Sequence, residues 1–181
     1  MDPELDATGV RQAELAGERL SKWGIGAIYC SELQRAARTA QIINGYAQAR
    51  LILLPDLREL SYGTWEGKRR EEVERENAVF IQQWLQDRFH ISAPGGESFH
   101  DLGIRLERVV ALLTHATADK IAVVTHQGVL KALLCLFLEI SPAKQAHFWF
   151  HNGSISAVEY DRPAHHFKIL FLNDCAHLEQ V

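Results

Sequence analysis

The sequence predicts an α/β fold with a mostly parallel central sheet. Three runs of four apolar residues, at 27–30, 51–54 and 121–124, are too short for helices and fit strands that are buried on both faces. Segments with the apolar spacing of amphipathic helices lie between and around these runs. Strands that alternate with helices in this way indicate a parallel sheet with helices packed against it.

Composition limits the class of protein and its partners. The chain has 181 residues, which suffice for one domain with a substantial core. Hydrophobic residues make up 47%, charged residues 23%, and the net charge is −4, so neither a nucleic-acid nor a membrane-surface partner is indicated. The three cysteines form no C-x-x-C pair, so no zinc site or disulfide framework is expected. No signal peptide or transmembrane pattern is visible, and the cytoplasm is the expected compartment.

The first elements along the chain are a helix and then a strand–turn–helix unit. Thr8 is the expected N-cap of the first helix, which ends at Gly24 and Gly26. The run 27–30 is the next element, and the segment Ser31-Glu-Leu-Gln34 matches the capping-box pattern that begins a helix. The second helix is therefore expected to begin directly at the end of a strand.

Arg35 lies in the first turns of that second helix. A cation near a helix N-terminus is slightly unfavourable, and this cost disappears if an anion lies in front of both. The alternative is a solvated surface arginine. Arg38, one turn further on, is either another surface charge or shares the role.

The segment 55–67 follows the second strand and combines glutamates, glycines and aromatic residues. Such a loop can present a carboxyl group inside a partly apolar site, which suits a general acid, and Glu59 is the candidate. The alternative is a solvent-facing acidic loop with Tyr62 and Trp65 folded onto the core. Residues 68–97 are predicted to form a helical lid or insertion over the carboxyl edge of the sheet, with the charge run as a solvated face.

The remaining elements follow the lid. Apolar residues with helical spacing predict an amphipathic helix from about 98 to 113, which leads into the strand at 121–124. Near the carboxyl end, the runs 154–160 and 167–172 predict two strands that are joined by a turn.

His126 lies where the strand 121–124 ends and a helix over about 129–138 begins. Gly128 is expected to let the backbone turn tightly at this point. In open α/β sheets ligands bind in the crevice at the carboxyl ends of the strands, and a helix N-terminus attracts anions. A titratable imidazole at this point indicates phosphate chemistry. The alternative is a histidine that only caps the helix or bonds a carbonyl.

Three polar side chains therefore follow three strands: Arg35, Glu59 and His126. In a parallel sheet the carboxyl ends of the strands lie at one edge, so these groups should meet in one crevice. An arginine and an imidazolium can hold phosphoryl oxygens, and a carboxylic acid can protonate a leaving alkoxide. The set suits phosphoryl transfer without a metal, although it lacks an obvious nucleophile.

Several motifs resemble those of the histidine phosphatase superfamily, the phosphoglycerate mutase-like enzymes, and they occur in the family's order over most of the chain. Within the superfamily, the segments 31–36 and 126–130 look most like the α-ribazole phosphatase branch. That branch removes phosphate from a nucleotide-loop precursor of cobalamin. The matching segments are Asp2-Pro-Glu-Leu-Asp-Ala-Thr-Gly9, Arg11-Gln-Ala13, Cys30-Ser-Glu-Leu-Gln-Arg35-Ala36, Thr39-Ala40, Leu57-Arg-Glu59-Leu, Tyr62-Gly, Trp65-Glu-Gly67, Pro94-Gly-Gly-Glu-Ser98 and Thr125-His126-Gln-Gly-Val-Leu130.

The resemblance implies a fold, an activity and site roles. The implied fold is a three-layer α/β/α sandwich, and the implied activity is hydrolysis of a small phosphorylated metabolite through a phosphohistidine, with no metal or other cofactor. Arg35 would belong to the phosphate pocket, Glu59 would donate and accept the proton, and His126 would stabilise the phosphoryl group. Gln127 and Gly128 would supply backbone N–H groups. The implied substrate side would be lined by Tyr62.

One departure from the family pattern is large. The family's nucleophile lies in an Arg-His-Gly triplet at the end of a first strand, and none of the nine histidines here has that context. We expect a shortened version of an active enzyme whose nucleophile and central strand lie upstream of Met1. Such a chain should be destabilised, inactive, or repaired by strand exchange or assembly, for example as a homodimer. The alternatives are a non-catalytic phosphate-ligand or protein-binding module and a phosphoglycerate mutase-type phosphotransferase.

Overall fold

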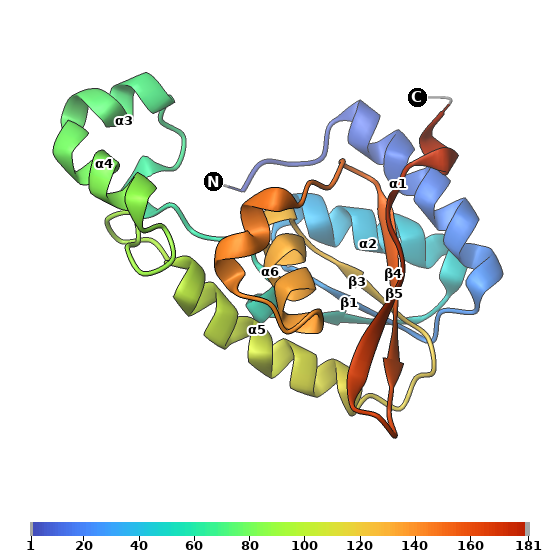
Figure 1. Ribbon diagram of the computed structural model, residues 1–181. Helices are drawn as coiled ribbons and strands as arrows, with labels where there is room; N and C mark the ends of the chain where they lie inside the picture. The colour runs from blue at the N-terminus through green and yellow to red at the C-terminus, as the bar shows by residue number, and fades with distance from the viewer. Residues whose placement is uncertain (1, 180–181) are drawn as a thin grey trace.

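The computed structural model describes residues 2–179, which form helices packed around short strands (Figure 1). The α-helices are α1 (Ala7–Leu20), α2 (Gln34–Ala47), α3 (Arg70–Glu76), α4 (Ala78–Gln86), α5 (Phe99–Thr114) and α6 (Gln127–Phe137). The strands are β1 (Ala27–Cys30), β2 (Arg50–Leu53), β3 (Ile121–Val124), β4 (Ile155–Asp161) and β5 (His166–Asp174). Short 3-10 helices are η1 (Ser21–Trp23), η2 (Pro55–Leu57), η3 (Gly63–Trp65), η4 (Pro142–His147) and η5 (Ala176–Leu178).

The strands form two separate sheets in residues 2–179. The order β2-β1-β3 forms a parallel three-stranded sheet, in which Ala27 is level with both Arg50 and Ile121. Strands β4 and β5 pair only with each other within residues 2–179 and form an antiparallel ribbon. The α/β class and the parallel pairing of the three predicted strands are confirmed.

Side chains of β1 point alternately into two apolar cores, one on each face of the parallel sheet. Each core is covered by its own layer of helices. Ile28 and Cys30 are fully buried on the side of α1 and α2. Tyr29 packs on the opposite side, against residues of α5 and α6. Figure 1 shows α5 and α6 together, with α1 and α2 in the layer beyond the strands. The three layers bring the carboxyl ends of β1, β2 and β3 to one edge.

Helices α3 and α4 stand away from the sheet, and Figure 1 shows loops joining them to the body of the molecule. They occupy 70–86 of the expected lid, and residues 87–98 return to α5 mostly as turns and loop. Trp65 from η3 packs against α4, since its ring lies edge to face 5.9 Å from that of Phe80 and 5.1 Å from that of Trp84. Such aromatic pairs each contribute about 1 kcal/mol beyond their buried area.

Two helix starts differ from those expected. The N-cap of α1 is Asp6, not Thr8, because the Asp6 carboxylate accepts the Gly9 N–H at 2.7 Å. Helix α2 begins at Gln34, and the Ser31 hydroxyl accepts the Leu33 N–H at 3.2 Å, so Ser31 does not form a capping box. In the part of the chain that the structure describes, no helix is both long and apolar enough to cross a membrane.

Candidate functional site

Glu59 is held rigidly at the N-terminus of α6. Its loop follows β2 and is anchored by Leu57 and Leu60, which are buried on either side of it. One carboxylate oxygen of Glu59 accepts the Leu60 N–H at 2.9 Å, and the other accepts the Gly128 N–H at 3.1 Å. Both oxygens are therefore oriented by backbone donors, one from the next residue and one from a residue 69 positions further along the chain.

Gly128 is required by this contact rather than by a turn. It lies within α6 and does not adopt a positive φ, so the expectation of a glycine turn here is wrong. A Cβ atom at position 128 would lie 2.5 Å from Oε1 of Glu59. The Gly128 N–H, which was expected to face phosphoryl oxygens, donates instead to Glu59.

His126 is the N-cap residue of α6 and is only 7% exposed. Its Nε2 atom lies 2.8 Å from the hydroxyl oxygen of Ser31. Burial, followed by the positive charge of Arg35, lowers the pKa of His126 to about 4, although the carboxylate of Asp2 acts in the opposite direction. The imidazolium expected from the sequence is therefore absent near neutral pH, and the ring is neutral.

Arg35 lies in the first turn of α2 and carries an unsatisfied buried donor. Its Nη1 atom is the one fully buried side-chain nitrogen or oxygen without a hydrogen-bond partner in residues 2–179. The nearest carboxylate is that of Asp2, 3.9 Å away, which accepts the Gln34 N–H at 2.7 Å instead. Arg38 is exposed and lines a different, smaller cavity, so it does not share this position.

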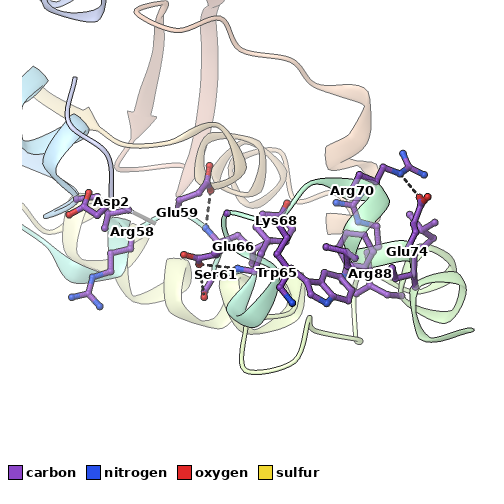
Figure 2. Close-up of a pocket in the computed structure, with 18 of the residues that line it drawn as sticks. Asp2, Arg58, Glu59, Ser61, Trp65, Glu66, Lys68, Arg70, Glu74 and Arg88 are labelled. Atoms are coloured by element: carbon purple, nitrogen blue, oxygen red, sulfur yellow. Dashed lines mark hydrogen bonds and ion pairs between the residues drawn. The ribbon is translucent and has the colours of Figure 1, made fainter. Parts of the chain in front are cut away.

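A cavity of about 1020 Å³ extends from the strand ends to α3 and α4. Figure 2 shows Asp2 and Glu59 at one end of the drawn set and Arg70 and Arg88 at the other. Arg35 and Glu59, two of the three residues predicted to meet in one crevice, line the cavity together, and Tyr62 lines it with them.

The helix α6 residues lie behind this wall. None of the three residues His126, Gln127 and Gly128 lines the cavity. Gly128 is connected to it by the hydrogen bond to Glu59, and His126 is connected to it by the nearby charge of Arg35. The side chain of Gln127 donates to the Phe150 carbonyl at 2.9 Å, so it serves the packing of the chain.

The far half of the cavity has aromatic and cationic walls. The Trp84 ring lies 6.3 Å from that of Tyr62, and the guanidinium of Arg88 lies 4.3 Å from the Trp84 ring centre. Lys68 and Arg70 line the same half. A ligand that reaches this half would meet flat apolar surfaces with charges of both signs beside them, because Glu74 lines it as well and pairs with Arg70 at 2.6 Å.

Sequence reasoning missed three contributors to the site: Asp2, Ser31 and Arg105. The Arg105 guanidinium binds Glu97 at 2.7 Å and donates to the carbonyls of Asp56 and Arg58, so it clamps the loop that carries Glu59. No local signal marks this role of Arg105, because the two carbonyls in the Glu59 loop that it binds lie 47 and 49 residues away along the chain. The sequence marked Ser31 by its position directly after an apolar strand and by its place in the family-like segment 31–36, but gave no sign of its contact with His126.

The fold and the cavity define an α/β protein with a charged crevice at the carboxyl ends of its parallel strands. Residues 1–174 match the model of the histidine phosphatase superfamily, branch 1. The chain belongs to this superfamily, and the resemblance drawn from the motifs is confirmed.

Three relatives illustrate the match. The adenosylcobalamin/alpha-ribazole phosphatase of Escherichia coli K12 is 29% identical over 167 residues, which cover 92% of this chain and 82% of the relative. A probable phosphoglycerate mutase of Yersinia enterocolitica is 31% identical over 182 residues, covering 98% and 85%. The crystal structure of the alpha-ribazole phosphatase from Shigella flexneri has a TM-score of 0.87 at 28% identity, covering 96% of this chain and 86% of that one.

Proposed function

We propose that this protein is a phosphomonoesterase that hydrolyses a small phosphorylated metabolite. The observation that carries the proposal is the buried Nη1 atom of Arg35, which has no hydrogen-bond partner in residues 2–179 and only a distant ion pair with Asp2 at 3.9 Å, at the end of a cavity shared with Glu59. A buried guanidinium donor without a partner is costly, and a phosphoryl oxygen would satisfy it with a charge-assisted hydrogen bond. Membership of the superfamily supports the same conclusion.

Each polar residue has a role under this proposal. Arg35 binds the phosphoryl oxygens, and His126 adds a neutral N–H donor from behind. Glu59, which lines the cavity and is held by two backbone donors, gives a proton to the leaving alkoxide and then takes one from the attacking water. Tyr62 lines the side that the leaving group occupies.

The covalent route implied by the family needs a nucleophilic imidazole in an Arg-His-Gly triplet. The 181 residues contain no such triplet. We propose a phosphohistidine intermediate for a polypeptide that carries that triplet at this cavity, and reading the DNA upstream of the Met1 codon tests for it directly.

The cavity supports a leaving group larger than glycerate or serine. Its volume of about 1020 Å³ lies at the upper end of the range for small-molecule sites, and Trp65 and Trp84 line its far half. The phosphate ester of α-ribazole, a substrate that the names of several relatives indicate, is therefore the candidate substrate. Turnover of 3-phosphoglycerate or phosphoserine in preference to bulky aromatic phosphates would contradict this choice.

Oxyanion binding tests the phosphate site without requiring turnover. Phosphate or vanadate affinity, measured by calorimetry, should fall at least tenfold in Arg35→Ala, because a charged hydrogen bond is worth about 1.5–3 kcal/mol. Arg38→Ala is the matched control, since Arg38 is an exposed arginine one turn along the same helix. Equal affinity in wild type and Arg35→Ala would remove Arg35 from the site and overturn the proposal.

A second candidate is a phosphate-ligand binding module without catalysis. It is favoured by the absence of an Arg-His-Gly triplet from the 181 residues. An assay with a generic aryl phosphate separates the two candidates, because a binding module would show Arg35-dependent oxyanion affinity and no turnover above an Arg35→Ala background.

A further inference from the structure

We infer that Ser31 is a positioning residue that fixes the neutral ring of His126 with its proton on Nδ1. The inference deepens the proposed function, on which it rests for the identity of the bound anion. It concerns a buried contact that the motifs did not identify.

The hydrogen-bonding capacity of Ser31 decides the direction of the contact. Ser31 is 0% exposed, so its hydroxyl proton must find an acceptor inside the protein. The hydroxyl oxygen already accepts the Leu33 N–H at 3.2 Å. Its one remaining partner in the described structure is Nε2 of His126, at 2.8 Å. The Ser31 hydroxyl therefore donates its proton to Nε2.

The protonation of the ring follows from that direction. A neutral imidazole has one nitrogen that donates and one that accepts. Because Nε2 accepts from Ser31, the proton of the neutral ring is on Nδ1. Within residues 2–179 Nδ1 has no hydrogen-bond partner, and it is not a fully buried unsatisfied atom, so it retains contact with solvent. The ring thus keeps one N–H donor without a protein partner in residues 2–179, and we assign this donor to an oxyanion that binds behind the cavity wall, at the buried Nη1 atom of Arg35.

Charged groups around the ring favour the same state. Arg35 from α2 and Arg105 from α5 oppose a positive charge on His126, whereas Asp2 from the N-terminal segment favours one. Protonating Nε2 would also force the Ser31 hydroxyl to turn away and would leave its proton without an acceptor in a fully buried position. A neutral N–H donor beside a cationic arginine can bind phosphate without the repulsion that two adjacent cations would create.

The primary test is made on the wild-type protein, with one variant used only for signal assignment. Protein labelled with 15N-histidine is examined by long-range 1H–15N NMR at pH 7, and the His126 signals are assigned by their loss in His126→Gln. We expect His126 to carry its proton on Nδ1. A proton on Nε2 in the wild-type protein would overturn the inference, whether or not the protein binds phosphate.

Variants at Ser31 test causation. In Ser31→Ala the His126 ring should shift towards the Nε2–H form, and phosphate affinity should fall about fivefold, as expected for loss of one aligned hydrogen bond. Ser31→Thr, which keeps the hydroxyl, should retain the Nδ1–H form. The matched control is Ser98→Ala, since Ser98 is a buried serine that caps α5. It should lower the melting temperature without changing the His126 tautomer.

The outcomes separate this inference from the proposed function. An unchanged tautomer in Ser31→Ala would reduce Ser31 to a packing role and overturn the inference. A wild-type protein with the Nδ1–H ring that binds neither phosphate nor vanadate would overturn the proposed function and leave the tautomer assignment standing.

Discussion

The two strand–helix junctions, β1–α2 and β3–α6, have similar sequence patterns and different chemistry. Each runs from a four-residue apolar strand through a short polar connection into a helix, and at each a carboxylate accepts a helix N-terminal N–H. At α6 the carboxylate is Glu59, which is fixed through both oxygens by a buried loop. At α2 it is Asp2, which lies on an exposed N-terminal segment.

The difference separates two tasks. The β3–α6 junction holds the Glu59 carboxylate in one orientation, because the contacts that fix Glu59 come from the core. In residues 2–179 the β1–α2 junction leaves the Nη1 atom of Arg35 without a hydrogen-bond partner, because Asp2 bonds to the backbone of Gln34 and stays 3.9 Å away. A rigid junction thus suits proton transfer, and an unsatisfied one suits anion binding.

The largest expected effect falls on the proton donor at the rigid junction. Under the proposed function, Glu59→Gln should reduce turnover of alkyl phosphates by about 10²–10⁴, because a general acid contributes that factor when the leaving group is poor. Aryl phosphates with good leaving groups should lose far less. Steady-state kinetics on both substrate types measure this, with Glu74→Gln as control, since Glu74 lines the far half of the cavity and pairs with Arg70. Equal losses on both substrates would argue against proton donation by Glu59.

The buried imidazole at the same junction should make stability depend on pH. The pKa of His126 is about 4 in the folded protein, against 6.5 for an unperturbed histidine, so between these values the unfolded chain binds more protons. The contribution of neutral His126 to the free energy of unfolding is therefore fully present above pH 6.5. It is lost as pH falls towards 4, by about 3 kcal/mol in total.

Urea denaturation between pH 4 and 7 measures this dependence. His126→Gln should flatten the profile in this window, and the exposed His147→Gln should not. If the stability of the His126→Gln protein depended on pH as steeply as that of the wild type, this dependence could not be assigned to His126.

A smaller effect is expected from adding a side chain at Gly128, where α6 contacts Glu59. A Cβ atom at Gly128 would lie 2.5 Å from the carboxylate, so Gly128→Ala should displace Glu59 and lower alkyl phosphate turnover about tenfold to a hundredfold. Gly103→Ala in α5 is the control, because nothing lies within 4 Å of a Cβ atom there. That change should stabilise the protein by about 0.4–1 kcal/mol and leave turnover unaltered. Unaltered turnover in both variants would show that Glu59 does not depend on this contact.

The smallest effect is expected at the open junction. Asp2→Asn keeps an acceptor for the Gln34 N–H and removes a negative charge 3.9 Å from Arg35, so phosphate affinity should rise about twofold to fivefold at low salt. The gain should diminish at high ionic strength, because Asp2 is partly exposed. The control is Asp6→Asn at the N-cap of α1, which should leave phosphate affinity unchanged. Weaker binding in Asp2→Asn would show that Asp2 supports the site.

The sequence pattern predicted the strands and helices well where their physical cause lies within a short stretch of the chain. The alternation of Ile28, Tyr29 and Cys30 between two cores follows from the two-residue period of a strand, and the parallel pairing follows from the intervening helices. The placement of Arg35 and Glu59 on one cavity followed from their positions after successive strands. The capping role assigned to Ser31 was wrong, because a buried tertiary partner outweighed the local motif.

The sequence by itself determined the α/β class, the order of strands and helices, and which polar residues would gather at one edge of the sheet. These features depend on apolar periodicity and chain connectivity, which are written along the chain. Only the tertiary structure decided that His126 is neutral, that Gly128 makes room for Glu59, and that Arg105 clamps the loop beside it. Burial and contacts between segments that are tens of residues apart set these properties, and neither is encoded in a local pattern.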